Sequence, residues 1–113
     1  MGTNGKREAF VRFHDVPLIE GVKELLKMDE APGGTHANLE FLCSSGAVVW
    51  EDELPEDYQL ALADAQTAGG LLLSVAQDRV DDLMAALAKA GVSAAAEIGE
   101  IIADPDCRVH VEI

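Results

Sequence analysis

The chain has 113 residues, enough for one domain with a single core, and 49% of them are hydrophobic while only 4% are aromatic. Its formal net charge is −13, so nucleic acids and anionic membranes would repel it through their phosphates. With no signal peptide and no apolar run of the ~20 residues that a membrane helix needs, the sequence predicts a cytoplasmic protein with no nucleic-acid or membrane partner.

The N-terminal part of the chain predicts a tail, a strand and a helix. Residues 1–7 are mostly small and polar and are expected to be a disordered tail or an expression remnant, and the domain is expected over residues 8–113. Partial alternation of apolar residues predicts a strand over Glu8–His14. Pro17 suits the first turn of a helix, which is expected to end near Met28.

The middle of the chain alternates between breaks and short elements. The Gly- and Pro-containing run Ala31–Thr35 predicts a break. Ala47–Trp50 suits a short strand, and the acidic run Glu51–Asp57 suits a loop. Tyr58–Ala63 predicts a short helix. Leu71–Ala76 is continuously apolar apart from one serine and predicts a buried strand.

The last third predicts a helix followed by two more strands. Asp78 is expected to cap the helix, and Gly91 stands where a helix C-cap belongs. The apolar residues of this helix recur at helical spacing: Val80, Leu83, Met84 and Leu87. Strands are predicted over Ala94–Ile102 and Arg108–Ile113, with a turn at Asp104–Asp106 between them. Taken together, the elements indicate an α/β domain.

The first motif that could carry chemistry is Pro-Gly-Gly-Thr, which contains Gly33, Gly34 and Thr35 and is followed by Asn38. Paired glycines let backbone N–H groups approach a ligand closely, so the segment could cradle a phosphate at a helix start. It could equally be a turn in which Thr35 caps the residues after it, and on the motif alone this second interpretation is favoured.

The second motif runs from Asp64 to Gly70 and leads into the apolar stretch. Its polar side chains, Gln66 and Thr67, stand beside Gly69 and Gly70 on a loop, where ligand groups are often placed. Turn chemistry explains the same residues, with Asp64 as a cap. The residues favour neither interpretation.

The spacing of the histidine and cysteine residues does not predict a catalytic site. His14 and His110 alternate out of predicted strands and are expected to be solvated, while His36 beside the first motif is the one histidine that suggests a functional role. Cys43 and Cys107 are expected to be reduced and unpaired. No nucleophile has an evident base and no phosphate-binding lysine loop is present, so the sequence predicts no catalytic residue and no metal ligand.

Three stretches resemble the C-terminal domain of selenophosphate synthetase (selenide, water dikinase), a family of the aminoimidazole ribonucleotide synthetase superfamily. Val16–Gly21 is similar to the family's Val-Pro-Leu-Leu-Pro-Gly, and Pro32–Asn38 to its Pro-Gly-Gly-Thr with an Asn three residues on. Asp64–Leu72 is similar to Asp-Pro-Gln-Thr-Ser-Gly-Gly-Leu-Leu. Within this last stretch Ala65 replaces the family's Pro and Ala68 its Ser, and the lost hydroxyl weakens a phosphate-binding role for the loop.

The resemblance implies a mixed β-sheet with helices packed on it, truncated at its N-terminal side relative to the family domain. It implies phosphorylation of selenide by ATP, with ATP and magnesium held by an N-terminal domain that this chain lacks. The chain alone is therefore expected to be inactive, to bind no cofactor and to self-associate. The residues expected to face the substrate phosphates are Gly33, Gly34, Thr35, Asn38, Gln66, Thr67, Gly69 and Gly70. The alternative is an acidic module that reuses the fold for protein contacts.

The resemblance also predicts where these residues lie. Both glycine motifs are expected on one side of the domain, facing a cleft shared with the ATP-binding part. The alternative is two unrelated turns at opposite ends of the sheet.

Overall fold

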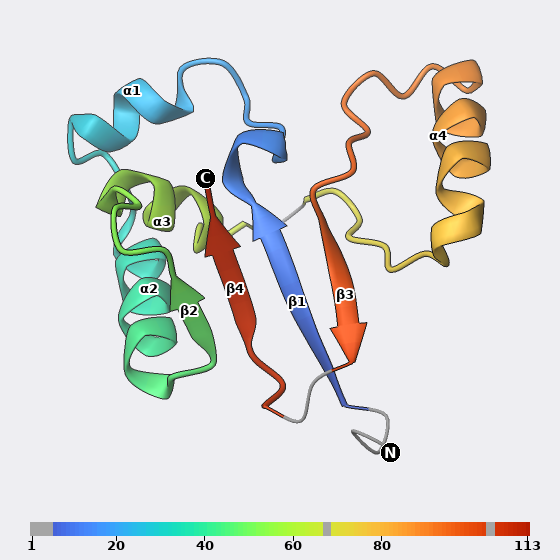
Figure 1. The fold of residues 1–113 in the computed structure, drawn as a ribbon. Coiled ribbons are helices and arrows are strands. Elements are labelled where there is room, and N and C mark those ends of the chain that lie inside the picture. Colours follow the sequence, from blue (N-terminus) through green and yellow to red (C-terminus); the bar gives the residue numbers. More distant parts are fainter. Residues whose placement is uncertain (1–5, 67–68, 104–105) are drawn as a thin grey trace.

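A computed structural model describes residues 6–66, 69–103 and 106–113 (Figure 1). The strands are β1 (Arg7–Arg12), β2 (Val48–Trp50), β3 (Gly99–Ala103) and β4 (Val109–Glu112). The helices are α1 (Val22–Lys27), α2 (Gly33–Ser45), α3 (Glu56–Leu62) and α4 (Val80–Lys89), with short 3-10 turns at Phe13–Asp15 and Gln77–Arg79. The predicted mixed α/β fold is confirmed. None of the helices in the described ranges has the length and apolar character needed to cross a membrane.

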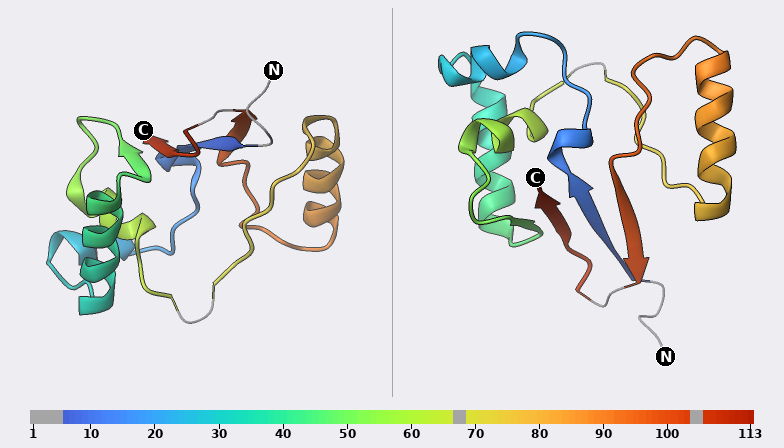
Figure 2. Two further views of the ribbon diagram at one scale, coloured as in Figure 1. Left: turned by 90° about the horizontal axis from the view of Figure 1, so that it is seen from below. Right: turned by 45° about the horizontal axis from the view of Figure 1, so that its top comes forward.

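The four strands form one sheet in the order β2-β4-β1-β3. β4 is parallel to both β1 and β2, and β3 is antiparallel to β1. A methyl group at Gly99 would clash with the backbone carbonyl of Phe10 on β1, so this position of β3 requires glycine. Figure 2 shows α1, α2 and α3 grouped at the β2 end of the sheet.

The core lies between the sheet and these three helices. One cluster contains the buried residues Phe13, Leu54 and Val111, and a second contains Leu39, Leu60 and Ala63. Trp50 of β2 packs against both clusters and links them. The core is thus mainly aliphatic, in keeping with the low aromatic content.

Two helix starts differ from the sequence prediction. The first helix begins at Val22 rather than at Pro17, because Gly21 adopts a left-handed conformation with φ 93° and no helix can run through it. α2 begins at Gly33, inside the segment predicted as a break. Pro32, with φ −67° and ψ 157°, forms its N-cap, so glycine and proline here begin a helix rather than exclude one.

The predicted buried strand over Leu71–Ala76 is wrong. The segment is extended but pairs with no strand of the described sheet, and the exposed fractions of Leu71 and Leu72 are 88% and 81%. An apolar run forms a buried strand only where a neighbouring strand offers hydrogen-bond partners and an apolar face. The next predicted strand is shorter than expected, since β3 begins only at Gly99.

The expected termini of α4 are confirmed at one end only. Asp78 lies inside the 3-10 turn that precedes the helix and makes no capping hydrogen bond, so its predicted role is wrong. Gly91 has φ +85° and its N–H bonds to the carbonyl of Ala88, as a residue after a helix C-cap does. Of the predicted turn at Asp104–Asp106, the first two residues lie outside the described part.

Both cysteines are unpaired, as predicted, and the structure places both on the surface. We expect titration with a thiol reagent, without denaturant or reductant, to detect two sulfhydryl groups per chain, because both thiols are open to solvent. A Cys43→Ser variant should titrate as one. Finding no free thiol in freshly prepared protein would contradict this expectation.

Candidate functional site

The first glycine motif forms the first turn of α2. The N–H groups of Thr35 and His36 both bond to the carbonyl of Pro32, which closes the turn. The amides of Gly33 and Gly34 precede this point, and helix geometry gives them no carbonyl partner within α2. The positive end of the helix dipole lies at the same place. Two backbone donors are therefore available at the start of a 13-residue helix.

Thr35 joins the first motif to the second. Its side chain is completely buried, and its hydroxyl donates a 2.7 Å hydrogen bond to Oδ1 of Asp64. The hydroxyl oxygen of Thr35 also accepts a 3.1 Å hydrogen bond from the N–H of Ala65. One interpretation of the sequence made Thr35 an N-cap, and that interpretation is wrong because Thr35 lies inside α2. Its side chain instead holds the segment that follows α3.

Asn38 makes a second link one turn further along α2. Its side-chain amide donates a 3.0 Å hydrogen bond to the carbonyl of Ala63, the C-cap of α3. Gly34 adds close packing, since a methyl group at its Cα would stand 3.3 Å from Cβ of Ala65. Residues 63–65 are thus fixed against the first two turns of α2 by three hydrogen bonds and one tight contact.

The two predicted motifs therefore meet, and the alternative of two turns at opposite ends of the sheet does not hold. Gln66, Gly69 and Gly70 follow this junction and are exposed. Oε1 of Gln66 is 2.8 Å from the place that a Cβ at Gly69 would take, so glycine leaves room for this side chain. Thr67 lies outside the described residues.

Sequence reasoning missed the roles of Asp64 and Ala65. Asp64 was expected to be a cap, but its carboxylate accepts the Thr35 hydroxyl instead. Ala65 was noted only as a departure from the family pattern, yet its N–H completes the junction. Because proline has no N–H, the usual family residue could not make this bond. That difference was the one signal in the sequence that pointed to the contact.

Asp64 is the charged group at the junction, and its carboxylate acts there as an acceptor. His36, the histidine nearest the motif in sequence, has its Nε2 3.8 Å from Oδ1 of Asp29 in an exposed pair. Away from the junction, the pKa of Arg12 is raised above its ordinary value, chiefly by its hydrogen bond to Asp15. The donors offered at the junction are therefore neutral backbone and amide groups.

The expectation of a solvated His110 is wrong. Its Nε2 pairs with the carboxylate of Glu8, which is only 5% exposed, and its ring stacks on Phe10 with a centroid distance of 4.6 Å. His14 is exposed as expected. Strand alternation placed His110 on the correct face of the sheet but could not reveal its partner on the neighbouring strand.

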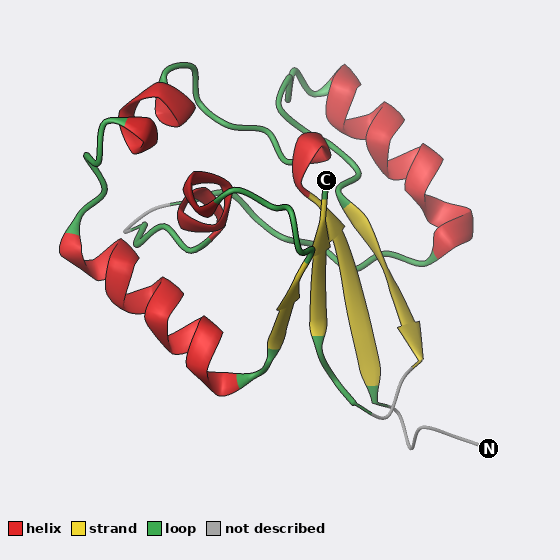
Figure 3. Cartoon of the chain, turned by 60° about the vertical axis from the view of Figure 1, so that its left-hand side comes forward, coloured by secondary structure: helices red, strands yellow, loops and turns green. Residues whose placement is uncertain are grey.

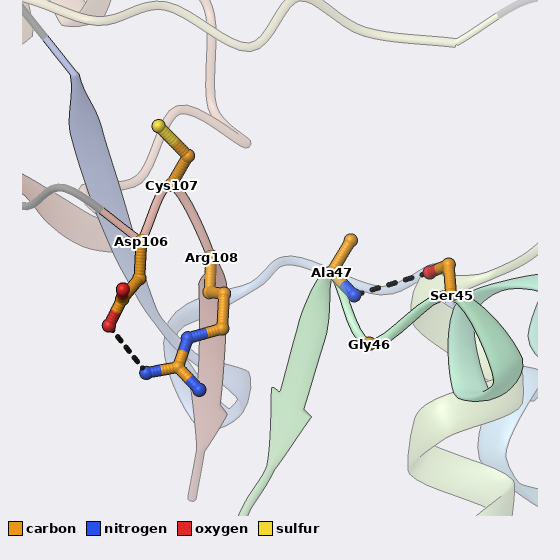
Figure 4. A pocket seen from close by; sticks show the side chains of 6 residues that line it. All are labelled: Ser45, Gly46, Ala47, Asp106, Cys107 and Arg108. Atoms are coloured by element: carbon orange, nitrogen blue, oxygen red, sulfur yellow. Dashed lines mark hydrogen bonds and ion pairs between the residues drawn. The ribbon is translucent and has the colours of Figure 1, made fainter.

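Two hollows in the described part of the chain lie away from the junction. One hollow of about 390 Å³ lies between the end of α2 and the start of β4 and is lined by Ser45, Gly46, Ala47, Asp106, Cys107 and Arg108 (Figure 4). A second, of about 310 Å³, lies beside Phe13 and Lys23. Neither hollow includes a residue of the two motifs.

No metal centre is visible in the described ranges, where His, Cys, Asp and Glu residues nowhere gather in threes. The residues at the junction do not fit a magnesium site, because Asp64 is the one carboxylate among its contacts and one of its oxygens already accepts the Thr35 hydroxyl. What the junction can do chemically is donate hydrogen bonds to an anion.

Comparison with known proteins gives consistent matches. The family model described as AIR synthase related protein, C-terminal domain, matches residues 20–112. The chain is 35% identical over 106 residues to proteins named selenide, water dikinase from Salmonella typhi and Escherichia coli K12. These matches cover 94% of the chain but 29% of each relative. The chain thus spans less than a third of the length of the curated relatives that it matches.

Proposed function

Since the chain belongs to the AIR synthase related family through the C-terminal domain matched by residues 20–112, we propose that it acts as the C-terminal portion of a selenophosphate synthetase. The full reaction is the formation of selenophosphate from selenide and ATP. In this proposal the part of the relatives beyond the matched 29% supplies the catalytic residues and the sites for ATP and magnesium. The present chain supplies structural support and donors that face the phosphates.

The observation that carries the proposal is the junction of the two glycine motifs at the first turn of α2. The amides of Gly33 and Gly34 suit a phosphate, because backbone donors at a helix start attract anions at short range. A chain with a net charge of −13 cannot attract ATP over a distance. Its contribution must come from such short-range neutral donors.

The burial of Thr35 divides the predicted site residues into two groups. Thr35 and Asn38 have their polar groups engaged with residues 63–65, so in the proposal they position the loop. The residues that face phosphate are then Gly33, Gly34, Gln66, Thr67, Gly69 and Gly70. The glycines allow the ligand to approach the backbone.

The proposal is tested by a chimera in which this chain replaces the matched segment of the Escherichia coli relative. We expect selenide-dependent formation of AMP from ATP by the chimera and none by the isolated chain. A folded chimera without this activity would contradict the proposal and leave the protein-interaction module as the alternative. Selenide-dependent formation of AMP by the isolated chain would contradict the proposal that the catalytic residues lie outside it.

The Gly33→Ala variant of the chimera separates ligand contact from folding. A methyl group at Gly33 meets no atom within 4 Å, so the substitution should not disturb the fold. We expect it to raise the KM for ATP about tenfold by blocking close approach of phosphate, which corresponds to about 1.4 kcal/mol. Ser44→Ala, on the exposed far end of α2, is the control and should leave KM unchanged. If the Gly33→Ala and Ser44→Ala chimeras had the same KM for ATP, the proposal that phosphate approaches Gly33 would be wrong.

A further inference from the structure

The strand β4 lies between two partners that both run parallel to it. Figures 1 and 3 show β4 between β2 and β1. Its Val109 lies opposite Ala9 of β1 and opposite Val48 of β2. A strand held on both sides by parallel partners can move along them and keep the direction of both pairings. Side chains must therefore fix the register of β4.

The apolar residues of β4 do not fix its register by themselves. Val109 and Val111 face the core, and Ile113 follows at the same spacing. Because alternate residues share one face of a sheet, a slip by two residues keeps every side chain on its face. One such slip places Val111 opposite Ala9 and Ile113 where Val111 now lies, so two aliphatic residues again fill the core. We call this arrangement the slipped register.

The apolar residues exclude a slip by two residues in the opposite direction. That slip would place Cys107 in the position of Val109 and would move Val111 out of the core. Cys107 has φ 55°, which is left-handed and does not suit a strand, and Val111 is 5% exposed in a buried cluster. Of the two slips, the apolar residues therefore permit only the slipped register.

The other face of the same strands carries charged groups that distinguish the two registers. Phe10 lies opposite His110, and Arg12 lies opposite Glu112. The ring of His110 stacks on Phe10, and its Nε2 pairs with the carboxylate of Glu8, which is 5% exposed. In the observed register a buried carboxylate thus meets an imidazole that can donate to it.

The slipped register would bring two carboxylates together. Glu112 would take the position of His110 and would lie beside Glu8. Glu8 would then lose its imidazole partner and gain a like charge at a buried position. Removing one partner from a buried pair changes an equilibrium constant at least about a hundredfold, because the remaining charge stays out of water.

We propose that Glu8 determines the register of β4 by attracting His110 and repelling Glu112. The core would accept either register, so the choice depends on this one carboxylate. The register also sets the place of Arg108, which directly precedes β4 and lines the hollow at the end of α2. At about 3.3 Å per residue, a slip by two residues would carry Arg108 roughly 6.6 Å along the sheet and away from this hollow.

The test changes the charge at Glu8 in the full chain and reads the register by nuclear magnetic resonance. Nuclear Overhauser effects of Ala9 report the register, because Ala9 lies opposite Val109 in the observed register and opposite Val111 in the slipped one. Glu8→Lys reverses the charge that Glu112 would meet. Circular dichroism checks that the variant remains folded.

We expect contacts of Ala9 with Val109 alone in the wild-type chain, and contacts with Val111 as the major set in Glu8→Lys. Glu100→Lys is the control, because it makes the same change at an exposed residue of β3, which does not pair with β4 in the described sheet. It should keep the wild-type contacts. Wild-type contacts alone in Glu8→Lys would overturn the proposal, and so would an equal effect of the control.

The Glu8→Gln variant decides the question if Glu8→Lys does not fold. Glutamine has the shape of glutamate and can still accept a hydrogen bond from His110, so the fold should persist. It no longer repels Glu112, and a neutral hydrogen bond favours the observed register only about tenfold. A second set of Ala9 resonances, from about one molecule in ten, is therefore expected. A single set with the wild-type contacts would overturn the proposal.

Discussion

Replacing Phe13 by alanine is expected to lower the free energy of unfolding by about 3–5 kcal/mol. Phe13 is 1% exposed and forms a buried cluster with Leu54 and Val111. Its ring stacks on Tyr58 with a centroid distance of 4.2 Å and an interplanar angle of 12°. Truncation removes these contacts and leaves a cavity where the sheet meets the helices. Urea denaturation of the full chain, followed by circular dichroism, measures the change.

The Phe41→Ala variant is the matched control for Phe13→Ala. Phe41 lies on α2 with 68% of its surface exposed, so the same truncation should change stability by no more than about 0.5 kcal/mol. Because both variants remove the same atoms, their difference reports burial alone. Similar losses for the two variants would mean that Phe13 does not anchor the core.

Thr35→Val is expected to lower the free energy of unfolding by about 2–3 kcal/mol, because valine fills the same space but can neither donate to Asp64 nor accept from Ala65. The second expected effect is local. The Ala65 amide, which bonds to the Thr35 hydroxyl, should exchange its hydrogen faster with solvent. Denaturation measures the first effect and hydrogen exchange of this amide the second.

Thr35→Ser is the control for the hydroxyl. It keeps both hydrogen bonds and removes one methyl group, so protection of the Ala65 amide should remain while some stability is lost. If the serine and valine variants lost amide protection equally, the hydroxyl would not hold the junction. The contribution of Thr35 would then be packing alone.

The elements that the sequence predicted well are those determined by local pattern. β4 alternates Val109 and Val111 toward the core, and α4 repeats its apolar residues at helical spacing. Gly91 was recognised because the end of a helix often requires a left-handed residue. Each of these features depends on residues close together in the chain, so periodicity and turn chemistry were sufficient.

The elements that the sequence predicted poorly depend on distant neighbours. Leu71–Ala76 has the composition of a buried strand but lacks a pairing partner in the described sheet. His110 looked solvated because its partner, Glu8, lies 102 residues away. α2 was missed because the glycines that begin it also suit a turn. In each case tertiary context decided between two local possibilities.

The sequence predicted that the two glycine motifs lie close to one another. Thr35 links the first motif to Asp64 at the beginning of the second, while Asn38 bonds to Ala63 just before it. The sequence could not show that the Thr35 side chain is buried and engaged, because burial depends on how α2 packs against the end of α3. Contact of these motifs with phosphate stays a prediction.

The parallel pairing of β1 with β4 has a consequence for how the chain folds during synthesis. In that pairing Ala9 lies opposite Val109, so the first strand emerges from the ribosome well before its partner has been made. Translation adds about 5–20 residues per second, so β1 waits on the order of ten seconds. Contacts so distant in sequence also make folding slow. The nascent chain therefore leaves the β4-facing edge of β1 unpaired for seconds before β4 has been made.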